Sequence, residues 1–112
     1  MKTDWFLMAI GLMWVALPLT LRMYWEAWDS LPARMAVHFD LQFRPNGYAS
    51  KQVATAFGIG MLTFILATFT FTGLMVENAK KDGIWLFVAI AYAIVTLMTW
   101  VNWFIIKSNL DS

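Results

Sequence analysis

The sequence predicts an all-α integral membrane protein with three transmembrane helices and a structured loop between the first and the second. Of the 112 residues, 61% are hydrophobic and only 13% are charged, too little polar surface for a soluble domain of this size. Charges are absent from residues 5–21, 52–76 and 84–106, which together make up more than half of the chain. A chain of this length allows one domain, so residues 1–112 are expected to form a single membrane domain.

The first transmembrane helix is predicted over about residues 5–25. The uncharged part of this segment would span only roughly 26 Å as a helix, against a hydrocarbon core of about 30 Å. It becomes long enough if the helix continues to Trp25 and the charged end of Arg22 reaches the headgroups. The segment resembles a signal peptide, but no small-residue cleavage site follows it, so we expect it to be retained. Pro18 predicts a kink near the end of this helix.

The second and third transmembrane helices are predicted over about residues 51–77 and 83–106, with a loop over residues 26–50 before them. Their uncharged stretches would span roughly 38 and 35 Å, enough to cross a membrane with some tilt. Most tryptophans lie at the ends of the predicted helices, as in the aromatic belts of membrane proteins. These are Trp5, Trp25, Trp28, Trp85, Trp100 and Trp103.

Small residues form a stripe along the second predicted helix, at steps of three and four residues. The stripe consists of Ala56, Gly60, Thr63 and Ala67, and it continues to Thr70. Small side chains allow helices to approach closely in lipid, so we expect the stripe to pack against the third helix. The alternative is that it forms a seam between two copies of the chain. Asn102 in the third helix is expected to hydrogen-bond across helices.

The connection over residues 22–51 is long for a compact domain, and such connections usually carry function or structure of their own. Apolar residues alternate strictly with other residues from 35 to 44, which predicts a short strand over 35–44. His38 and Asp40 would share its polar face, roughly 6.6 Å apart. The histidine then either makes a proton or metal contact with Asp40, or hydrogen-bonds the loop onto a helix end.

The segment after this strand is predicted to be a turn over residues 44–47, because Pro-Asn-Gly is typical turn chemistry. Ser50 is predicted to be the N-cap of the second helix. No segment of similar length remains to pair with the strand, so its edge would be open to a peptide or to a second copy of the chain. The alternative is an irregular loop with a solvated backbone.

Several function classes are not expected. The chain has no cysteine, a single histidine and no HExxH motif, so we expect neither a metal site nor a cofactor. No serine has the G-x-S-x-G setting of a nucleophile, and we do not expect an enzyme. A net charge of +1 without a basic stripe argues against nucleic-acid binding. The absence of charges from the predicted spans argues against a pump or a transporter built from this chain alone.

The loop carries a motif of 21 residues, from Leu31-Pro32 through His38-Phe39-Asp40 to Pro-Asn-Gly-Tyr-Ala-Ser-Lys at 45–51. It resembles the domain-of-unknown-function family 1648, whose pattern is roughly L-P-x-x-I-P-x-H-F-(N/D)-x-x-G-x-P-D-G-(W/Y)-(G/A)-S-K. The resemblance covers about residues 5–76. Three departures from the pattern matter: Ala36 replaces a proline, Phe43 a glycine and Asn46 an aspartate.

The resemblance implies a multi-pass protein of the bacterial cytoplasmic membrane. The same domain forms the N-terminal part of SdpI-type toxin-immunity proteins, which confer resistance to a secreted peptide toxin and relay its presence to a regulator. Those relatives are longer, so only the N-terminal module is implied here. The motif residues implied to bind a partner are His38, Phe39, Asp40, Pro45, Asn46, Gly47, Tyr48, Ser50 and Lys51.

Two functions are therefore expected as alternatives. The first is a small membrane module that binds a peptide or an envelope partner through residues 22–51, in an immunity, sensing or regulatory role. The second is a structural subunit of a larger membrane assembly. The count of positive charges favours a cytoplasmic loop, whereas the resemblance implies an extracytoplasmic one. We expect a cytoplasmic N-terminus and an extracytoplasmic loop.

Overall fold

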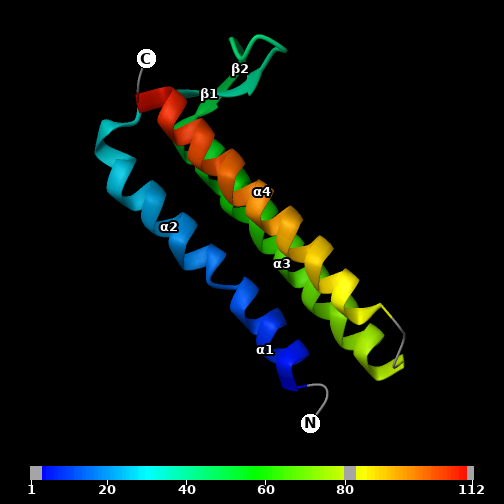
Figure 1. Ribbon diagram of the computed structural model, residues 1–112. Helices are drawn as coiled ribbons and strands as arrows, with labels where there is room; N and C mark the ends of the chain where they lie inside the picture. Colours follow the sequence, from blue (N-terminus) through cyan, green and yellow to red (C-terminus); the bar gives the residue numbers. More distant parts are fainter. Residues whose placement is uncertain (1–3, 80–82, 111–112) are drawn as a thin grey trace.

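The computed structural model of the protein describes residues 4–79 and 83–110. The elements follow in the order α1 (Asp4–Met13), α2 (Ala16–Ala27), the 3-10 turn η1 (Trp28–Ser30), β1 (Arg34–Phe39), β2 (Pro45–Ser50), α3 (Lys51–Ala79) and α4 (Ile84–Leu110). Figure 1 shows α3 and α4 side by side, with α1 and α2 in line along them and the two strands at the end of the bundle where α4 finishes. The bundle is elongated, with extents of 50 × 28 × 18 Å.

Within residues 4–79 and 83–110, three helical segments are long and apolar enough to cross a membrane. They are Trp5–Ser30, Lys51–Met75 and Ile84–Leu110. The prediction of three long apolar helices from the uncharged stretches is therefore confirmed. The chain is mostly helical, and a small two-stranded sheet is added to the predicted helices.

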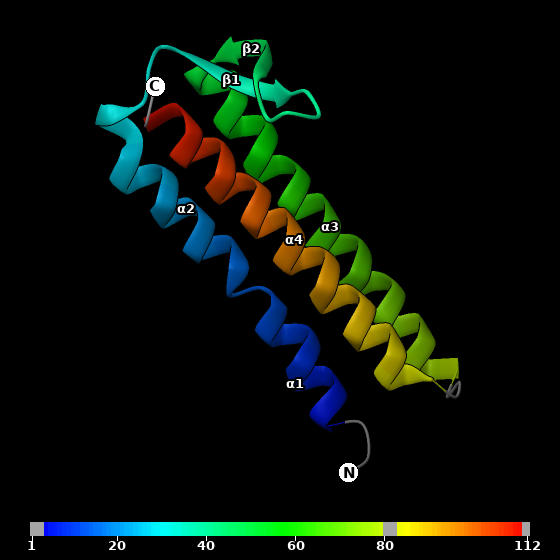
Figure 2. The same ribbon diagram turned by 45° about the horizontal axis from the view of Figure 1, so that its top comes forward.

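The N-terminal helix is interrupted, and the break lies four residues before Pro18. Proline has no N–H, and its ring clashes with the carbonyl of the residue four positions earlier, which here is Trp14. Trp14 and Val15 leave the helix, and the Trp14 carbonyl accepts the N–H of Leu17 instead, at 3.1 Å. The indole N–H of Trp14 donates to the Thr70 hydroxyl on α3 at 2.8 Å. Figure 2 shows the resulting gap between α1 and α2.

Residues 34–50 form an antiparallel hairpin, which corrects two sequence predictions. The predicted strand over 35–44 ends at Phe39, and residues 45–47 of the predicted turn over 44–47 instead form the first half of β2. The actual turn is made by the side chain of Asp40. Its carboxylate accepts the N–H groups of Gln42 and Arg44, each at 2.9 Å, as aspartate does in turns.

The predicted N-cap is confirmed at the point where the hairpin meets α3. The Ser50 hydroxyl accepts the N–H of Val53 at 3.1 Å, which satisfies one of the free donors in the first turn of the helix. Because β2 ends at Ser50 and α3 begins at Lys51, the strand runs into the helix without an intervening loop. The direction of α3 therefore fixes the position of β2.

Among the described residues, two buried clusters hold the elements together. The first joins α1 to α3 and α4. It consists of Phe6, Ile10, Met13, Leu62, Leu66, Ala91 and Val95. The second lies under the hairpin and consists of Tyr24, Ala27, Leu31, Met35, Ala54 and Ile106. Met35 of β1 is fully buried, so the apolar face of the strand is packed against the ends of the helices.

The prediction that the small-residue stripe packs α3 against α4 is wrong. Ala56, Gly60 and Ala67 are exposed, and a Cβ at Gly60 would meet nothing within 4 Å. The stripe residue Thr63 is only partly buried, and its hydroxyl donates to the carbonyl of Ile59 at 2.8 Å. The inner face of α3 instead carries Ala54, Gly58, Leu62, Leu66 and Gly73. Small residues occur on both faces of this helix, so their spacing alone did not identify the buried one.

Candidate functional site

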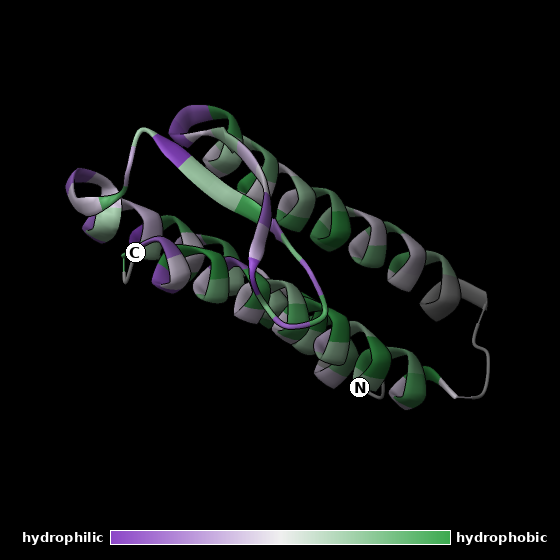
Figure 3. Ribbon diagram, turned by 90° about the horizontal axis from the view of Figure 1, so that it is seen from above, coloured by the Kyte–Doolittle hydropathy of each residue, from purple (hydrophilic) through white to green (hydrophobic). Residues whose placement is uncertain are grey.

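The hairpin lies across the end of the bundle, and hydrophilic and hydrophobic residues mix along it (Figure 3). Asn109, in the last turn of α4, binds the outer edge of β1. Its Oδ1 accepts the N–H of Ala36 at 2.8 Å, and its Nδ2 donates to the Ala36 carbonyl at 3.0 Å. This amide-to-amide pair provides the donor and the acceptor that a neighbouring strand would provide. The predicted open edge of the strand is thus paired with β2 on one side and closed at Ala36 on the other.

Lys51 fixes the other end of the hairpin to η1, the turn that follows α2. Its Nζ donates to the carbonyl of Trp28 at 2.8 Å and lies 4.5 Å from the centroid of the Trp28 ring, a cation–π distance. Its backbone N–H donates to the carbonyl of Ala33 at 2.8 Å. Together with Ser50, this residue was predicted to bind a partner. Their polar groups make contacts inside the chain, and these contacts hold the hairpin in place.

Asp40 has a similar internal role. Besides the two N–H groups of the turn, its carboxylate contacts Arg44, whose Nε lies 3.4 Å from Oδ2. These contacts of Asp40 go to the turn and not to His38. Among residues 4–79 and 83–110, no three His, Cys, Asp or Glu side chains are grouped so that they could hold a metal ion.

His38 lies across the hairpin over Gly47. The register of the two strands is irregular between Ala36 and Phe39, and His38 is opposite Gly47. A Cβ at Gly47 would come within 2.9 Å of the His38 Cβ. A larger residue at position 47 would therefore displace the imidazole, so this glycine allows the exposed histidine to lie where it does.

A pocket of about 400 Å³ lies between the hairpin and the helices. His38 and Tyr48 contribute to it from the two strands, and Tyr24 and Gly58 contribute from α2 and α3. The remaining walls are apolar and are formed by Val37, Ala49, Val53, Ala54, Phe57, Val101 and Ile105. The structure thus brings two of the predicted residues, His38 and Tyr48, to one pocket. Pro45 and Asn46 are exposed at the start of β2, outside it.

A buried polar pair adjoins this pocket. The hydroxyl of Tyr24 donates to Oδ1 of Asn102 at 2.5 Å, which confirms that Asn102 bonds across helices. A Cβ at Gly58 would overlap with the Asn102 oxygen and lie 2.8 Å from the Tyr24 hydroxyl. Sequence reasoning missed Tyr24 and Gly58. A tyrosine near the end of one helix and a glycine in the second turn of another give no signal of their own, because the pair forms only when three helices meet.

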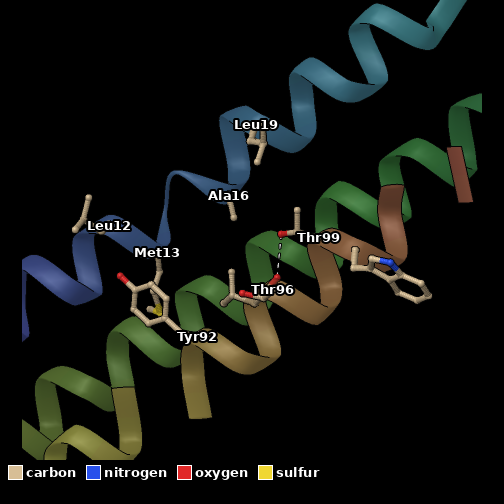
Figure 4. A pocket seen from close by; sticks show the side chains of 9 residues that line it. Leu12, Met13, Ala16, Leu19, Tyr92, Thr96 and Thr99 are labelled. Carbon is tan, nitrogen blue, oxygen red and sulfur yellow. Dashed lines mark hydrogen bonds between the residues drawn. The ribbon is translucent and has the colours of Figure 1, made fainter. Parts of the chain in front are cut away.

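A second pocket, of about 390 Å³, lies beside the break between α1 and α2 and faces α4 (Figure 4). Leu12, Met13, Ala16 and Leu19 form one side of it. Tyr92, Thr96 and Thr99 line it from α4, and the hydroxyls of Tyr92 and Thr99 are engaged within the chain. Tyr92 donates to the carbonyl of Ala9 at 2.6 Å, and Thr99 donates to that of Val95 at 2.9 Å. This pocket is therefore a mainly apolar gap beside the break in the helix.

One family model matches the chain, over residues 9–64, and it is described as a domain of unknown function (DUF1648). The matched segment runs from α1 through the hairpin into the first half of α3, and it includes Tyr24, His38, Tyr48 and Gly58. None of the curated proteins and none of the solved structures compared with the chain matches it.

Proposed function

The chain belongs to the DUF1648 family, and from this premise we propose that it is a bacterial inner-membrane protein whose hairpin binds a peptide or another envelope protein. The role would be in immunity, sensing or regulation. The observation that carries the proposal is the pocket of about 400 Å³ under the hairpin. This volume lies in the range of small-ligand pockets, which typically combine apolar walls with a few polar groups. An apolar side chain of a partner fits such a pocket, with His38 and Tyr48 available for hydrogen bonds.

Residue-specific cross-linking tests this proposal. We would place the photoreactive residue benzoylphenylalanine at Tyr48, which is 56% exposed at the pocket, and at Trp25, which is 83% exposed on α2. A partner bound at the hairpin gives a cross-linked product of defined mass from position 48 and not from position 25. The proposal is contradicted if both positions give the same product. It is also contradicted if neither position gives a product in cells that retain the folded protein.

The membrane placement of this proposal is supported by the three long apolar helical segments. The expected orientation has the N-terminus in the cytoplasm and the hairpin outside. Since the chain has no cysteine, Asn46→Cys provides a single exposed thiol on β2. A membrane-impermeant maleimide is expected to label it in intact cells. Labelling only after the cells are opened would reverse the orientation.

The alternative is a structural subunit of a larger membrane assembly. It is supported by the outer face of α3, where Phe57, Phe64 and Phe71 are exposed at intervals of seven residues and Gly60 and Ala67 are exposed between them. Large and small side chains alternating on one face can interlock with a neighbouring helix. Purification in mild detergent separates the two functions. A stoichiometric membrane partner that is lost with Gly60→Leu and kept with His38→Ala favours the subunit.

A further inference from the structure

The turn of the hairpin exposes its two large apolar side chains. Leu41 is 95% exposed and Phe43 is 65% exposed. Both belong to the turn that the Asp40 carboxylate holds closed, so their exposure is a consequence of a defined backbone conformation. Contact of such side chains with water is unfavourable.

The turn leans along α4 and does not project away from the bundle. The ring of Phe43 lies 5.7 Å from that of Phe104, and the ring of Phe39 lies 5.2 Å from it. Phe104 in turn stacks on Trp100 at 5.4 Å. Phe104 is six residues before the last residue of α4, which places it about 9 Å back along the helix axis. The turn therefore reaches back along α4 to the level of its tryptophans.

Trp100 and Trp103 are both exposed on α4. Exposed tryptophans near the ends of apolar helices mark the boundary between headgroups and acyl chains. A turn that contacts this surface at the same level lies at that boundary as well. The partner that fits Leu41 and Phe43 is therefore the lipid surface itself.

The backbone at Phe43 supports the same conclusion. Its φ is +61°, a left-handed conformation that disfavours a side chain and that glycine adopts freely. The conformation directs a phenylalanine to the flank of the bundle, where contact with Phe104 still leaves most of the ring uncovered. The adjacent Arg44 has an exposed guanidinium, and such groups bind lipid phosphates readily.

From these observations we infer that the turn Asp40–Arg44 is a membrane-interface anchor, in which Leu41 and Phe43 insert between lipid headgroups while Arg44 contacts phosphates. The inference rests on the membrane placement in the proposed function and is independent of its peptide-binding part. It assigns the tip of the hairpin to lipid and leaves the pocket at His38 and Tyr48 for a partner.

Spin labelling in a pure lipid system tests the anchor without any protein partner. Single cysteines would be placed at Leu41, at Asn46 on exposed β2 and at Phe64 on the outer face of α3. Each variant would be spin-labelled and reconstituted in vesicles of phosphatidylethanolamine and phosphatidylglycerol. Collision with oxygen, which concentrates in lipid, would be compared with collision with a water-soluble nickel complex.

The label at Leu41 is expected to collide more with oxygen than with nickel, and the label at Asn46 more with nickel than with oxygen. The inference is overturned if the label at Leu41 behaves like that at Asn46, or if neither reagent reaches it because protein covers it. The label at Phe64 separates the two proposals. A lipid-exposed Phe64 label with a water-exposed Leu41 label refutes the anchor alone, whereas water exposure at both refutes the membrane placement.

Discussion

At the scale of single residues, the structure depends on one close approach between three helices. Gly58 of α3 leaves room for the hydrogen bond between Tyr24 of α2 and Asn102 of α4. In an apolar interior an unpaired amide oxygen or hydroxyl costs more free energy than a pair of them gains. The absence of a side chain at position 58 is therefore a condition for this pair.

Gly58→Ala is expected to lower the free energy of unfolding by about 1–3 kcal/mol, because the added methyl group overlaps with the Asn102 oxygen. The matched control is Gly60→Ala on the outer face of the same helix, where a Cβ meets open space. This control is expected to leave stability unchanged or to raise it by up to about 1 kcal/mol, since alanine favours the helix. Unfolding by denaturant in detergent measures both. Equal losses for the two variants would contradict the account of Gly58.

At the scale of elements, the hairpin is a unit attached at several points. Asn109 holds the edge of β1, Lys51 holds the carbonyl of Trp28, and Ser50 joins β2 to α3. The ring of Phe104 supports the turn from α4. Because the attachments come from different helices, loss of one is expected to loosen the hairpin locally and to leave the bundle folded.

Asn109→Ala is expected to free both polar groups of Ala36. Two hydrogen bonds disappear, at a cost of about 1–3 kcal/mol for local opening of the hairpin. Hydrogen exchange of the Ala36 amide is the measurement, and it is expected to become faster by one to two powers of ten, as that free energy implies. Asn46→Ala, at an exposed position of β2, serves as the control and is expected to leave this exchange rate unchanged.

Pro18→Ala tests the origin of the break between α1 and α2. The substitution restores an N–H for the Trp14 carbonyl and removes the clash of the ring. We expect residues 14 and 15 to join a continuous helix and their amides to exchange more slowly. Unchanged exchange would mean that the packing around Trp14, with its hydrogen bond to Thr70, maintains the break by itself.

The long helices were predictable, because the positions of charges alone mark where an apolar helix begins and ends. The hairpin was predictable only in part. Alternation reveals β1, but β2 begins with Pro-Asn-Gly, which are turn residues by composition, and the actual turn is set by one carboxylate. The prediction that the small-residue stripe packs α3 against α4 failed because small residues lie on both faces of α3. Of the predicted site, His38 and Tyr48 meet at the pocket, whereas Tyr24 enters it only through tertiary packing.

At the scale of the whole molecule, the polar groups gather at one end. The hairpin, the pocket under it and the Tyr24–Asn102 pair all lie toward the end where α2 and α4 finish. The opposite half is held mainly by apolar contacts among α1, α3 and α4, together with the hydrogen bonds of Trp14 to Thr70 and of Tyr92 to Ala9. The recognition functions proposed here thus belong to one end of an otherwise apolar bundle.

The attachment of β1 to Asn109 also has a consequence for biogenesis. The two bonded residues are 73 positions apart, so a ribosome makes the whole hairpin and α3 before it makes the residue that closes the strand edge. Throughout that interval the edge at Ala36 remains open to other extended chains. The edge at Ala36 is closed only once α4 has taken its place beside the hairpin.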